Sequence, residues 1–207
     1  MRIIAGKRRG HKFEGPKGTK TRPTRDMVRE SLFNILGESV VDLLVVDLFA
    51  GTGALGLEAL SRGAARALFV EQNRENIALI RRNVAILRFE DRARILLADA
   101  YRWVRSYEAI DQEPLVVFLD PPYQDFESRP QRVNQLLTQL VEKLPSGSTI
   151  AVEAGRLFDD TLLPNFADWD IRRHGETQIA IRIVGEKGLT GLSEKLGRDE
   201  EEPDAAG

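Results

Sequence analysis

The chain has 207 residues, of which 42% are hydrophobic and 30% are charged, with a formal net charge of −2 and no cysteine. This composition suits one α/β domain with a sizeable core and a small appendage. It excludes disulfides, thiolate catalysis and cysteine-based zinc sites. The two histidines, His11 and His174, lack ligand spacing, so we expect no metal.

No apolar run is long enough to span a bilayer, because Asp42 and Asp47 interrupt the best stretch, residues 40–57. Met1 is followed by a basic, glycine-rich segment rather than by the apolar core of a signal peptide. We therefore expect a cytoplasmic protein that has no membrane partner.

Charge is distributed unevenly along the chain. Residues 1–25 hold nine basic side chains against Glu14 alone, whereas residues 186–207 hold seven acidic side chains against three basic ones. Such asymmetry indicates an end that faces nucleic acid and a solvated acidic tail, residues 186–207, which we expect to be disordered.

The chain begins with two short extended pieces, residues 2–5 and 11–13, around a basic tip that has a glycine at each end. This pattern predicts a hairpin that presents Lys7, Arg8 and Arg9 outward. With Lys12 and Arg22, these side chains could grip RNA phosphates. The alternative is an ordinary solvated loop.

A helix is expected over residues 24–37, after a connector rich in Gly, Pro and Lys, with Thr24 as its N-cap. Apolar side chains recur on one face of this helix, and Arg25 and Arg29 fall on the other side. Residues 1–40 are therefore predicted to form an N-terminal hairpin and helix extension that contacts RNA.

From residue 43 onward strand and helix patterns alternate, which predicts βα repeats and a parallel sheet. Strands are expected over residues 43–48, 67–71, 94–97, 115–119 and 149–153, and helices over residues 54–62, 74–89, 100–109 and 128–144. Strands 169–173 and 178–184 are joined by a short turn, as antiparallel strands are. The sequence thus predicts an α/β domain over residues 41–185, with a seven-stranded, mostly parallel sheet that ends in an antiparallel hairpin.

The apolar run 115–119 ends in Asp120, Pro121, Pro122 and Tyr123, at the carboxyl end of a strand, where ligands of open α/β sheets bind. The Asp120 side chain and the Pro121 carbonyl would supply two acceptors for the two N–H groups of an exocyclic amine. Tyr123 would stack on the base that carries this amine. The alternative is a stiff strand-to-loop turn, because Asp and Pro are common turn formers.

A glycine-rich loop follows the first strand and includes Gly51, Gly53 and Gly56. This spacing matches the dinucleotide fingerprint, so NAD binding has to be considered. In the dinucleotide fold, however, the first glycine follows the strand at once. Here Phe49 and Ala50 intervene, and the Asp47 carboxylate would repel a pyrophosphate but would suit a ligand with an amino group and a sulfonium.

Acids fall at four successive strand ends, at Asp47, Glu71, Asp99 and Asp120. Glu71 could accept hydrogen bonds from both ribose hydroxyls, and Asp99 from an adenine amine. Any one of these acids could instead be a helix N-cap. All four together with the glycine loop fit S-adenosylmethionine better than NAD.

With these motifs, the chain resembles the bacterial 16S ribosomal RNA guanine-N2 methyltransferases of the small-subunit methyltransferase D type. The resemblance covers residues 1–185 and rests on five strings: Arg2-Ile-Ile-Ala-Gly6, Thr21-Arg-Pro-Thr24, Val28-Arg-Glu-Ser-Leu-Phe-Asn34, Asp47-Leu-Phe-Ala-Gly-Thr-Gly-Ala-Leu-Gly-Leu-Glu-Ala-Leu60 and Asp120-Pro-Pro-Tyr123. The glycine loop and the last string occur in amino-methyltransferases broadly, whereas the N-terminal strings make the match to this family specific. The acidic tail matches no family element.

The resemblance implies a Rossmann-like, class I methyltransferase domain that uses S-adenosylmethionine and methylates one guanine amine of 16S RNA in an assembled or partly assembled small subunit. It implies cofactor contacts at Asp47, Phe49, Ala50, Gly51, Gly53, Glu71, Asp99 and Ala100. It also places Arg22 and Thr24 beside the cofactor and target pocket.

Several alternatives stay open from the sequence. A DNA adenine-N6 methyltransferase shares the amine site and the glycine loop, but the chain has no room between the motifs for a target-recognition region. A protein-glutamine methyltransferase would resemble Asn-Pro-Pro-Tyr instead. A non-catalytic RNA-binding assembly factor would keep the basic hairpin, although it would not need acids at four strand ends.

Overall fold

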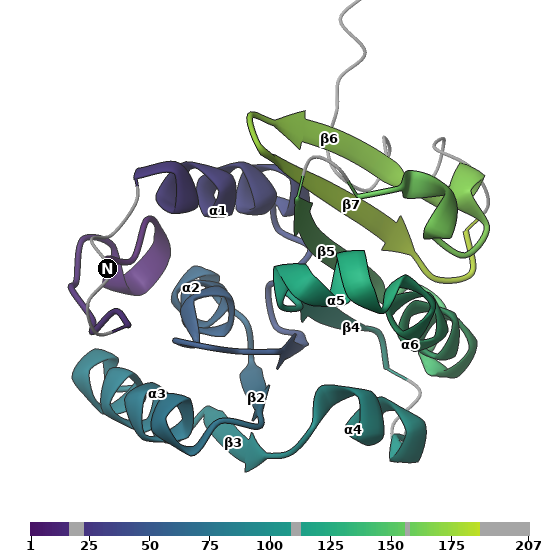
Figure 1. The fold of residues 1–207 in the computed structure, drawn as a ribbon. Helices are drawn as coiled ribbons and strands as arrows, with labels where there is room; N and C mark the ends of the chain where they lie inside the picture. Colours follow the sequence, from purple (N-terminus) through teal and green to yellow (C-terminus); the bar gives the residue numbers. More distant parts are fainter. Residues whose placement is uncertain (17–22, 109–112, 156–157, 187–207) are drawn as a thin grey trace, which may run out of the picture.

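The structure is a computed structural model, which describes residues 1–16, 23–108, 113–155 and 158–186. Figure 1 shows a central sheet with helices on both of its faces and the N-terminal segment beside α2. Of the sequence predictions, Arg22 and most of the acidic tail lie outside the described residues. No helix in the described ranges combines the length and the apolar character needed to cross a bilayer.

The described residues form a seven-stranded sheet in the order β3-β2-β1-β4-β5-β7-β6. The strands β1 to β5 pair in parallel, whereas β7 pairs antiparallel with both β5 and β6. The predicted fold class is therefore confirmed. The strands are β1 (Leu44–Leu48), β2 (Arg66–Glu71), β3 (Ala93–Leu97), β4 (Leu115–Leu119), β5 (Thr149–Gly155), β6 (Asp170–His174) and β7 (Thr177–Ile183).

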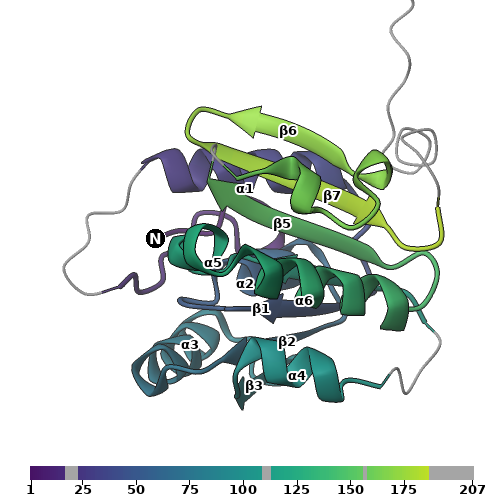
Figure 2. The same cartoon turned by 45° about the vertical axis from the view of Figure 1, so that its right-hand side comes forward.

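Two apolar cores lie on the two faces of the sheet, because side chains of successive strand residues point to opposite faces. Val45 and Phe69 belong to the core under α1, α2 and α3, and Val46 and Val70 to the core under α4, α5 and α6. Figure 2 looks onto the layer of α4, α5 and α6, with the sheet behind it. The helices are α1 (Pro23–Leu36), α2 (Ala54–Arg62), α3 (Arg74–Leu87), α4 (Ala100–Ser106), α5 (Tyr123–Ser128) and α6 (Pro130–Lys143).

The predicted helix over residues 128–144 was wrong at its start. Two helices, α5 and α6, meet at Arg129, where φ is −142° and the chain leaves the helical conformation. Pro130 then opens α6, because its fixed φ and missing N–H suit the first helical position. The chain therefore turns into α5 directly after the two prolines, so that Tyr123 lies on a helix rather than in a loop.

Other helix ends differ by one to three residues. Pro23 is the first residue of α1, so Thr24 lies within the first turn and is not the predicted N-cap. Helix α3 ends at Leu87, because Arg88 adopts a left-handed conformation with φ 55° and the helix cannot continue through it. Arg29, which we expected on the exposed side of α1, is buried and donates to the Arg2 carbonyl at 2.8 Å.

The N-terminal hairpin is only partly formed as predicted. A single antiparallel bridge joins Arg2 and Lys12, and a short 3-10 helix, η1 (Gly6–Arg8), occupies the tip. Lys7 and Arg9 are exposed, but Arg8 is not presented outward, since its Nε donates to the Leu87 carbonyl at 2.9 Å. The extension thus packs back on the main domain and shares its core through Ile3 and Phe13.

A buried acid holds this extension in place. Glu58 on α2 accepts hydrogen bonds from the backbone N–H groups of Ile4 and Ala5, at 2.8 and 3.0 Å. Its carboxylate also forms ion pairs with Arg29 and Arg62 at 3.8 and 2.9 Å. Because a buried charge needs such partners, Glu58 fixes the path of the extension along α2.

Candidate active site

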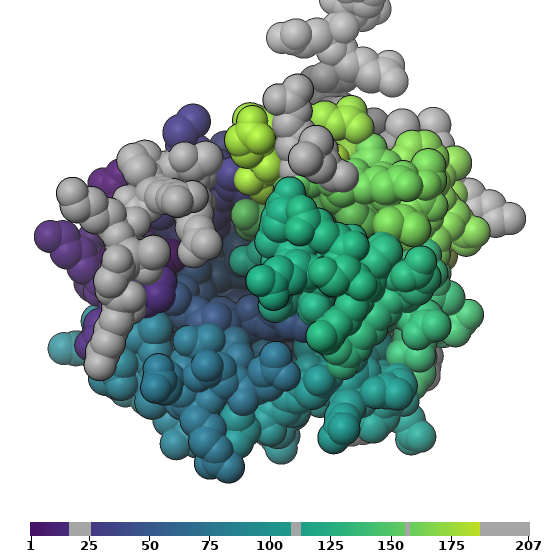
Figure 3. Space-filling view, in the orientation of Figure 1, coloured from purple at the N-terminus to yellow at the C-terminus, as the bar shows by residue number. Residues whose placement is uncertain are grey.

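A cavity of about 820 Å³ opens at the carboxyl end of the parallel strands. It lies where the strand order reverses between β1 and β4, which is the usual ligand position in open α/β sheets. Figure 3 shows the surface hollowed between α5 and the α2 and α3 region. The cavity has two ends: the first, beside β1, β2 and β3, is lined by Phe49, Gly51, Glu71, Asn73, Ala98 and Ala100, and the second, beside β4, β5 and β7, by Asp120, Pro121, Tyr123, Glu153, Gly155 and Thr177.

The glycine loop at the first end is built from left-handed residues. Phe49, Gly51 and Gly53 have φ values of 61°, 55° and 78°. Such a conformation is unusual for the non-glycine Phe49, and it turns the chain sharply from β1 toward α2. Gly56 serves packing instead, because a Cβ there would overlap the Phe69 ring on β2.

Asp47 lies beneath this loop and does not line the cavity. Its Oδ2 accepts from the Gly56 N–H at 2.9 Å, which ties β1 to the first turn of α2. The pKa of Asp47 is raised from 3.8 to about 8, mainly by burial and to a smaller extent by the nearby carboxylates of Asp120 and Glu71, against the lowering effect of the Gly56 hydrogen bond.

The expectation of a charged carboxylate at Asp47 that faces the ligand therefore needs correction. With a pKa of about 8, this side chain is mostly protonated at pH 7. Asp47 holds the loop in shape, whereas its direct contact with a cofactor stays a prediction. Ala50 and Gly53, which were also predicted to contact the cofactor, belong to the same loop but are not among the residues that line the cavity, so their contact stays a prediction too.

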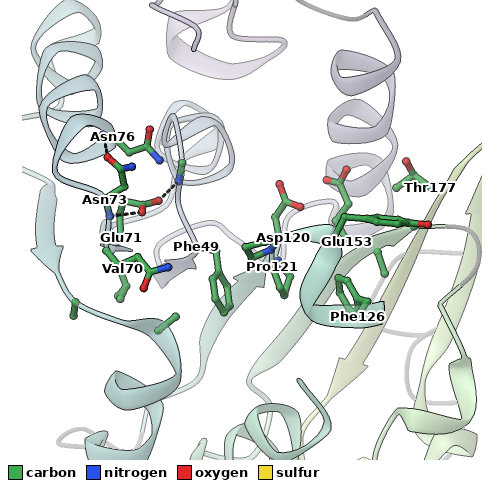
Figure 4. Close-up of a pocket in the computed structure, with 18 of the residues that line it drawn as sticks. Phe49, Val70, Glu71, Asn73, Asn76, Asp120, Pro121, Phe126, Glu153 and Thr177 are labelled. Carbon is green, nitrogen blue, oxygen red and sulfur yellow. Dashed lines mark hydrogen bonds between the residues drawn. The ribbon is translucent and has the colours of Figure 1, made fainter. Parts of the chain in front are cut away.

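Glu71 is the acid that the structure does bring to the first end of the cavity. Its Oε2 accepts from the Gly51 N–H at 2.8 Å and its Oε1 from the Asn73 N–H at 2.7 Å. Figure 4 shows these two bonds beside the opening. A carboxylate offers about four acceptor positions, so Glu71 retains lone pairs for a ligand's hydroxyl groups.

Asp99 is placed differently from Glu71. Its Oδ1 caps α4 by accepting from the Arg102 N–H at 3.0 Å, and its Oδ2 pairs with Arg132 at 3.3 Å. Its neighbours Ala98 and Ala100 line the cavity, whereas Asp99 does not. The N-cap alternative therefore holds for Asp99, and its contact with an adenine amine stays a prediction.

A series of side-chain contacts connects the two ends of the cavity. The rings of Phe49 and Tyr101 meet edge to face at 5.2 Å between their centroids. The Tyr101 hydroxyl donates to Asp125 on α5 at 2.8 Å. Together with burial, this hydrogen bond to Asp125 raises the pKa of Tyr101, so the phenol stays protonated. Helix α5, which starts at Tyr123, is thereby fixed relative to the glycine loop.

At the second end, the structure brings the predicted amine site together. Asp120 follows the last residue of β4, is exposed, and lines the same cavity as Gly51 and Glu71. Figure 4 shows its carboxylate directed into the open space above buried Pro121. The Tyr123 ring packs on Gly155 of β5, because only a glycine leaves room for the ring there.

Sequence reasoning missed several residues of the cavity wall. Glu153 closes the predicted fifth strand, so the strand-end rule that selected the other acids pointed to it as well. Asn73 lines the first end and caps α3 by accepting from the N–H groups of Glu75 and Asn76. Thr177 comes from the antiparallel strand β7, which no parallel-sheet rule places at the ligand.

The predicted RNA contacts that the structure describes belong to the N-terminal extension. Gly6 sits against the backbone of Ser61, so the basic tip lies at the end of α2 that is remote from the glycine loop. A nine-residue helix spans about 13 Å, so Lys7 and Arg9 are not at the cavity rim. Lys12 is exposed, and the side chain of Thr24 lies outside the part that the structure describes.

No group of acidic or histidine side chains among the described residues is placed to hold a metal ion.

A seven-stranded sheet of this order, with a glycine loop after β1 and Asp-Pro-Pro-Tyr after β4, defines the class of Rossmann-like methyltransferases. Comparisons with known proteins support this class and narrow it.

The family model described as conserved hypothetical protein 95 matches residues 1–183. The ribosomal RNA small subunit methyltransferase D of Escherichia coli strain K12 is 35% identical over 188 residues, which is 88% of each chain. Its namesake from Haemophilus influenzae is 35% identical over 59% of this chain and 64% of its own length. The chain therefore belongs to the conserved hypothetical protein 95 family, and its relatives include ribosomal RNA small subunit methyltransferases D.

Solved structures agree with this assignment. The Escherichia coli protein yhhF, titled as a candidate methyltransferase, has a TM-score of 0.68 at 32% identity and covers 87% of this chain and 96% of its own. A hypothetical protein from Thermus thermophilus has a TM-score of 0.69 at 26% identity, over 89% of this chain and 99% of its own. The protein is accordingly an enzyme of the methyltransferase class.

Proposed function

We propose that this protein transfers a methyl group from S-adenosylmethionine to the exocyclic N2 amine of one guanine in 16S ribosomal RNA. The substrate would be an assembled or assembling small ribosomal subunit in the cytoplasm, with no membrane partner and no metal. The observation that carries the proposal is the joint placement of Asp120, Pro121 and Tyr123 in one cavity with Glu71 and the glycine loop.

The first end of the cavity suits S-adenosylmethionine by its chemistry. Glu71 offers acceptors for ribose hydroxyls, and Ala98 and Ala100 offer an apolar wall for an adenine ring. The carboxylates of Glu71, Asp120 and Glu153 all line the cavity, and they favour a ligand that carries positive charge. A pyrophosphate would meet these acids unfavourably, which speaks against NAD.

When bound, S-adenosylmethionine supplies an electrophilic methyl group on a sulfonium. The protein's own part is to align the acceptor amine, and positioning of this kind can lower a barrier by about 7–11 kcal/mol. The Asp120 carboxylate and the Pro121 carbonyl would each accept one N–H of the amine. These bonds favour a pyramidal nitrogen and aim its lone pair toward the first end of the cavity.

Asp120 need not be a strong base, because the amine N–H becomes acidic once the nitrogen is alkylated. The carboxylate can then take this proton and release it to solvent, since Asp120 is exposed. Tyr123 would stack on the base, which must leave its RNA stack to enter the cavity. The ring is half exposed and backed by Gly155, so one of its faces is available to a base.

The names of the relatives support RNA rather than DNA as the substrate. The curated relatives carry ribosomal RNA of the small subunit in their names. Exposed Lys7, Arg9 and Lys12 would contact RNA phosphates, and Arg22 and Thr24 would lie near the bound base. The guanine-N2 specificity comes from the resemblance and from the fit of two acceptors to an amine.

The test is a methylation assay with purified protein and labelled S-adenosylmethionine. Small subunits from cells that lack this protein are expected to accept one methyl group per particle, and mass spectrometry should locate it on the N2 of one guanine. Duplex DNA and particles from wild-type cells should accept none. Methylation of DNA adenine, or of no substrate while the protein still binds the cofactor, would contradict the proposal.

A further inference from the structure

A second carboxylate stands beside the predicted amine site. Strands β4 and β5 are parallel with Leu119 opposite Val152, and Asp120 and Glu153 are the residues that directly follow this last pair. Neighbouring strands lie about 4.8 Å apart, and paired residues point to the same side of a sheet. The side chain of Asp120, just after β4, and that of Glu153 on β5 point to the same side of the sheet (Figure 4).

Glu153 lies at the second end of the cavity. Glu153 is half-buried and lines the cavity with Tyr123 and Thr177. Figure 4 shows the carboxylates of Asp120 and Glu153 side by side, with Glu71 on the far side of the opening. The Tyr123 ring lies against Gly155, two residues beyond Glu153 on β5. A base stacked on Tyr123 would present its edge to both carboxylates at once.

Among the four bases, only guanine presents donors that match two adjacent carboxylates. Its Watson–Crick edge carries the N2 amine and, next to it, the N1–H. Adenine and cytosine carry an amine next to a ring nitrogen that is an acceptor, and a carboxylate would face its lone pair. Uracil carries a ring N–H but has no amine. A charge-assisted hydrogen bond to a carboxylate is about twice as strong as a neutral one.

We infer that Glu153 is a specificity-determining residue, whose carboxylate accepts the N1–H of the target guanine while Asp120 and the Pro121 carbonyl hold its N2 amine. This inference rests on the proposed function and explains why the site selects guanine over the other bases. It assigns to Glu153 a contact with the substrate base and no part in cofactor binding, because Glu71 and the glycine loop lie at the other end of the cavity.

The experiment replaces the mapped target guanine by 2-aminopurine in a reconstituted small subunit. Both bases carry a 2-amino group, but 2-aminopurine has an acceptor at N1 and no oxygen at C6. The wild-type enzyme is expected to prefer guanine by at least about tenfold in kcat/KM, since one unsatisfied polar contact has this size. Glu153→Gln should bring this preference close to one, because the Gln side-chain amide can donate to the N1 acceptor.

The control variant is Glu127→Gln, which removes one exposed acid from α5 outside the cavity and should keep the wild-type preference. Thermal unfolding and S-adenosylmethionine binding of Glu153→Gln are expected to match the wild type. If Glu153→Gln turns over neither base, the same preference is taken from the dissociation constants of the two particles with S-adenosylhomocysteine present.

The outcomes separate this inference from the proposed function. If the wild-type enzyme methylates no guanine of the small subunit, the proposed function fails. If the wild-type enzyme methylates the guanine but Glu153→Gln keeps its full preference for guanine over 2-aminopurine, in turnover or in binding, the role of Glu153 is overturned. A loss of cofactor affinity in Glu153→Gln would likewise contradict it.

Discussion

Asp47 shows how one side chain can support a site without facing it. The pKa of its buried carboxyl lies at about 8 instead of its ordinary value of 3.8. The folded protein therefore holds this proton more tightly than the unfolded chain does between these two pH values. Linkage then requires the contribution of Asp47 to stability to fall as the pH rises from about 4 to about 8, and to stay constant above.

Asp47→Asn should remove this pH dependence, because an amide resembles the protonated acid and its oxygen can still accept from the Gly56 N–H. We expect the stability of the variant relative to the wild type to be higher at pH 8 than at pH 5. Urea unfolding at both pH values measures this difference. An identical difference at both values would mean that Asp47 is ionised in the folded protein.

Gly155 gives a second test on a single residue. A Cβ at this position would overlap the Tyr123 ring, so Gly155→Ala should displace the ring on which the base is proposed to stack. Turnover is expected to fall by about tenfold, because stacking on one aromatic ring contributes about 1–3 kcal/mol. Cofactor affinity, measured by calorimetry, should not change.

The background variant Tyr123→Ala supplies the control for this effect. If Gly155→Ala acts only through the ring, it should have little further effect once the ring is gone. An equal loss of turnover in both backgrounds would show that Gly155 acts on another part of the cavity.

For single residues, the sequence could predict which acids lie at strand ends but not what surrounds each of them. Glu71 and Asp120 line the cavity, whereas Asp47 and Asp99 hold backbone N–H groups of neighbouring helices. A strand-end position gives the edge of the sheet on which a residue lies. It does not say whether the side chain turns toward the cavity or toward the next helix, which depends on the path of the following loop.

The N-terminal extension is the element whose conformation the sequence predicted least well. The glycines at both ends of its tip did mark the turn, and both have a φ of 80°. Their surroundings differ, since Gly6 lies against the backbone of Ser61 and Gly10 has open space around it. The packing of Arg8 on Leu87 and Phe89 depends on contacts some 80 residues away, which no local pattern contains.

These two glycines form a matched pair of variants. Gly10→Ala should destabilise the protein by about 1–2 kcal/mol, which is the left-handed backbone penalty for a residue with a Cβ. Gly6→Ala should pay the same penalty and, in addition, separate the tip from α2. The unfolding temperature of Gly6→Ala should be lower than that of Gly10→Ala. Limited proteolysis should cut the N-terminal extension faster in Gly6→Ala than in Gly10→Ala. Equal stability and equal cleavage would show that the tip does not dock on Ser61.

The helices and strands of the main domain were predicted closely because each carries its own periodicity. The β4 sequence is apolar at every position and is buried throughout. The helix α5 was missed, because two prolines before Tyr123 indicate a loop when only local rules are applied. Prolines are compatible with the start of a helix, and the contact of Tyr101 with Asp125 fixes α5 in place.

At the scale of the whole molecule, the net charge of only −2 conceals an excess of basic side chains in the N-terminal segment. Lys7 and Arg9 are exposed there, at the far end of α2. The RNA would therefore have to extend from the cavity along α2 to reach them. A large particle such as a ribosomal subunit can present such a surface.

Neutralising Lys7 and Arg9 together, as Lys7→Ala with Arg9→Ala, should weaken binding to small subunits and lower the slope of log K against log salt by about 1.4–1.8, if each contacts one phosphate. The control is Arg105→Ala with Arg173→Ala, which removes the same charge from exposed positions on α4 and β6. Binding measured from low to high salt gives both slopes. An unchanged slope in the Lys7 and Arg9 variant would leave these residues without an RNA contact.

The most direct test of the account is the activity of Asp120→Ala beside that of the exposed-acid control Glu127→Ala. Both proteins are given small subunits and labelled S-adenosylmethionine, and cofactor affinity is measured in parallel. We expect Asp120→Ala to lose turnover by about 100-fold or more while it binds the cofactor within a few-fold of the wild type, and Glu127→Ala to behave as the wild type. Near-normal turnover by Asp120→Ala would remove the carboxylate from the amine site and contradict the proposed chemistry.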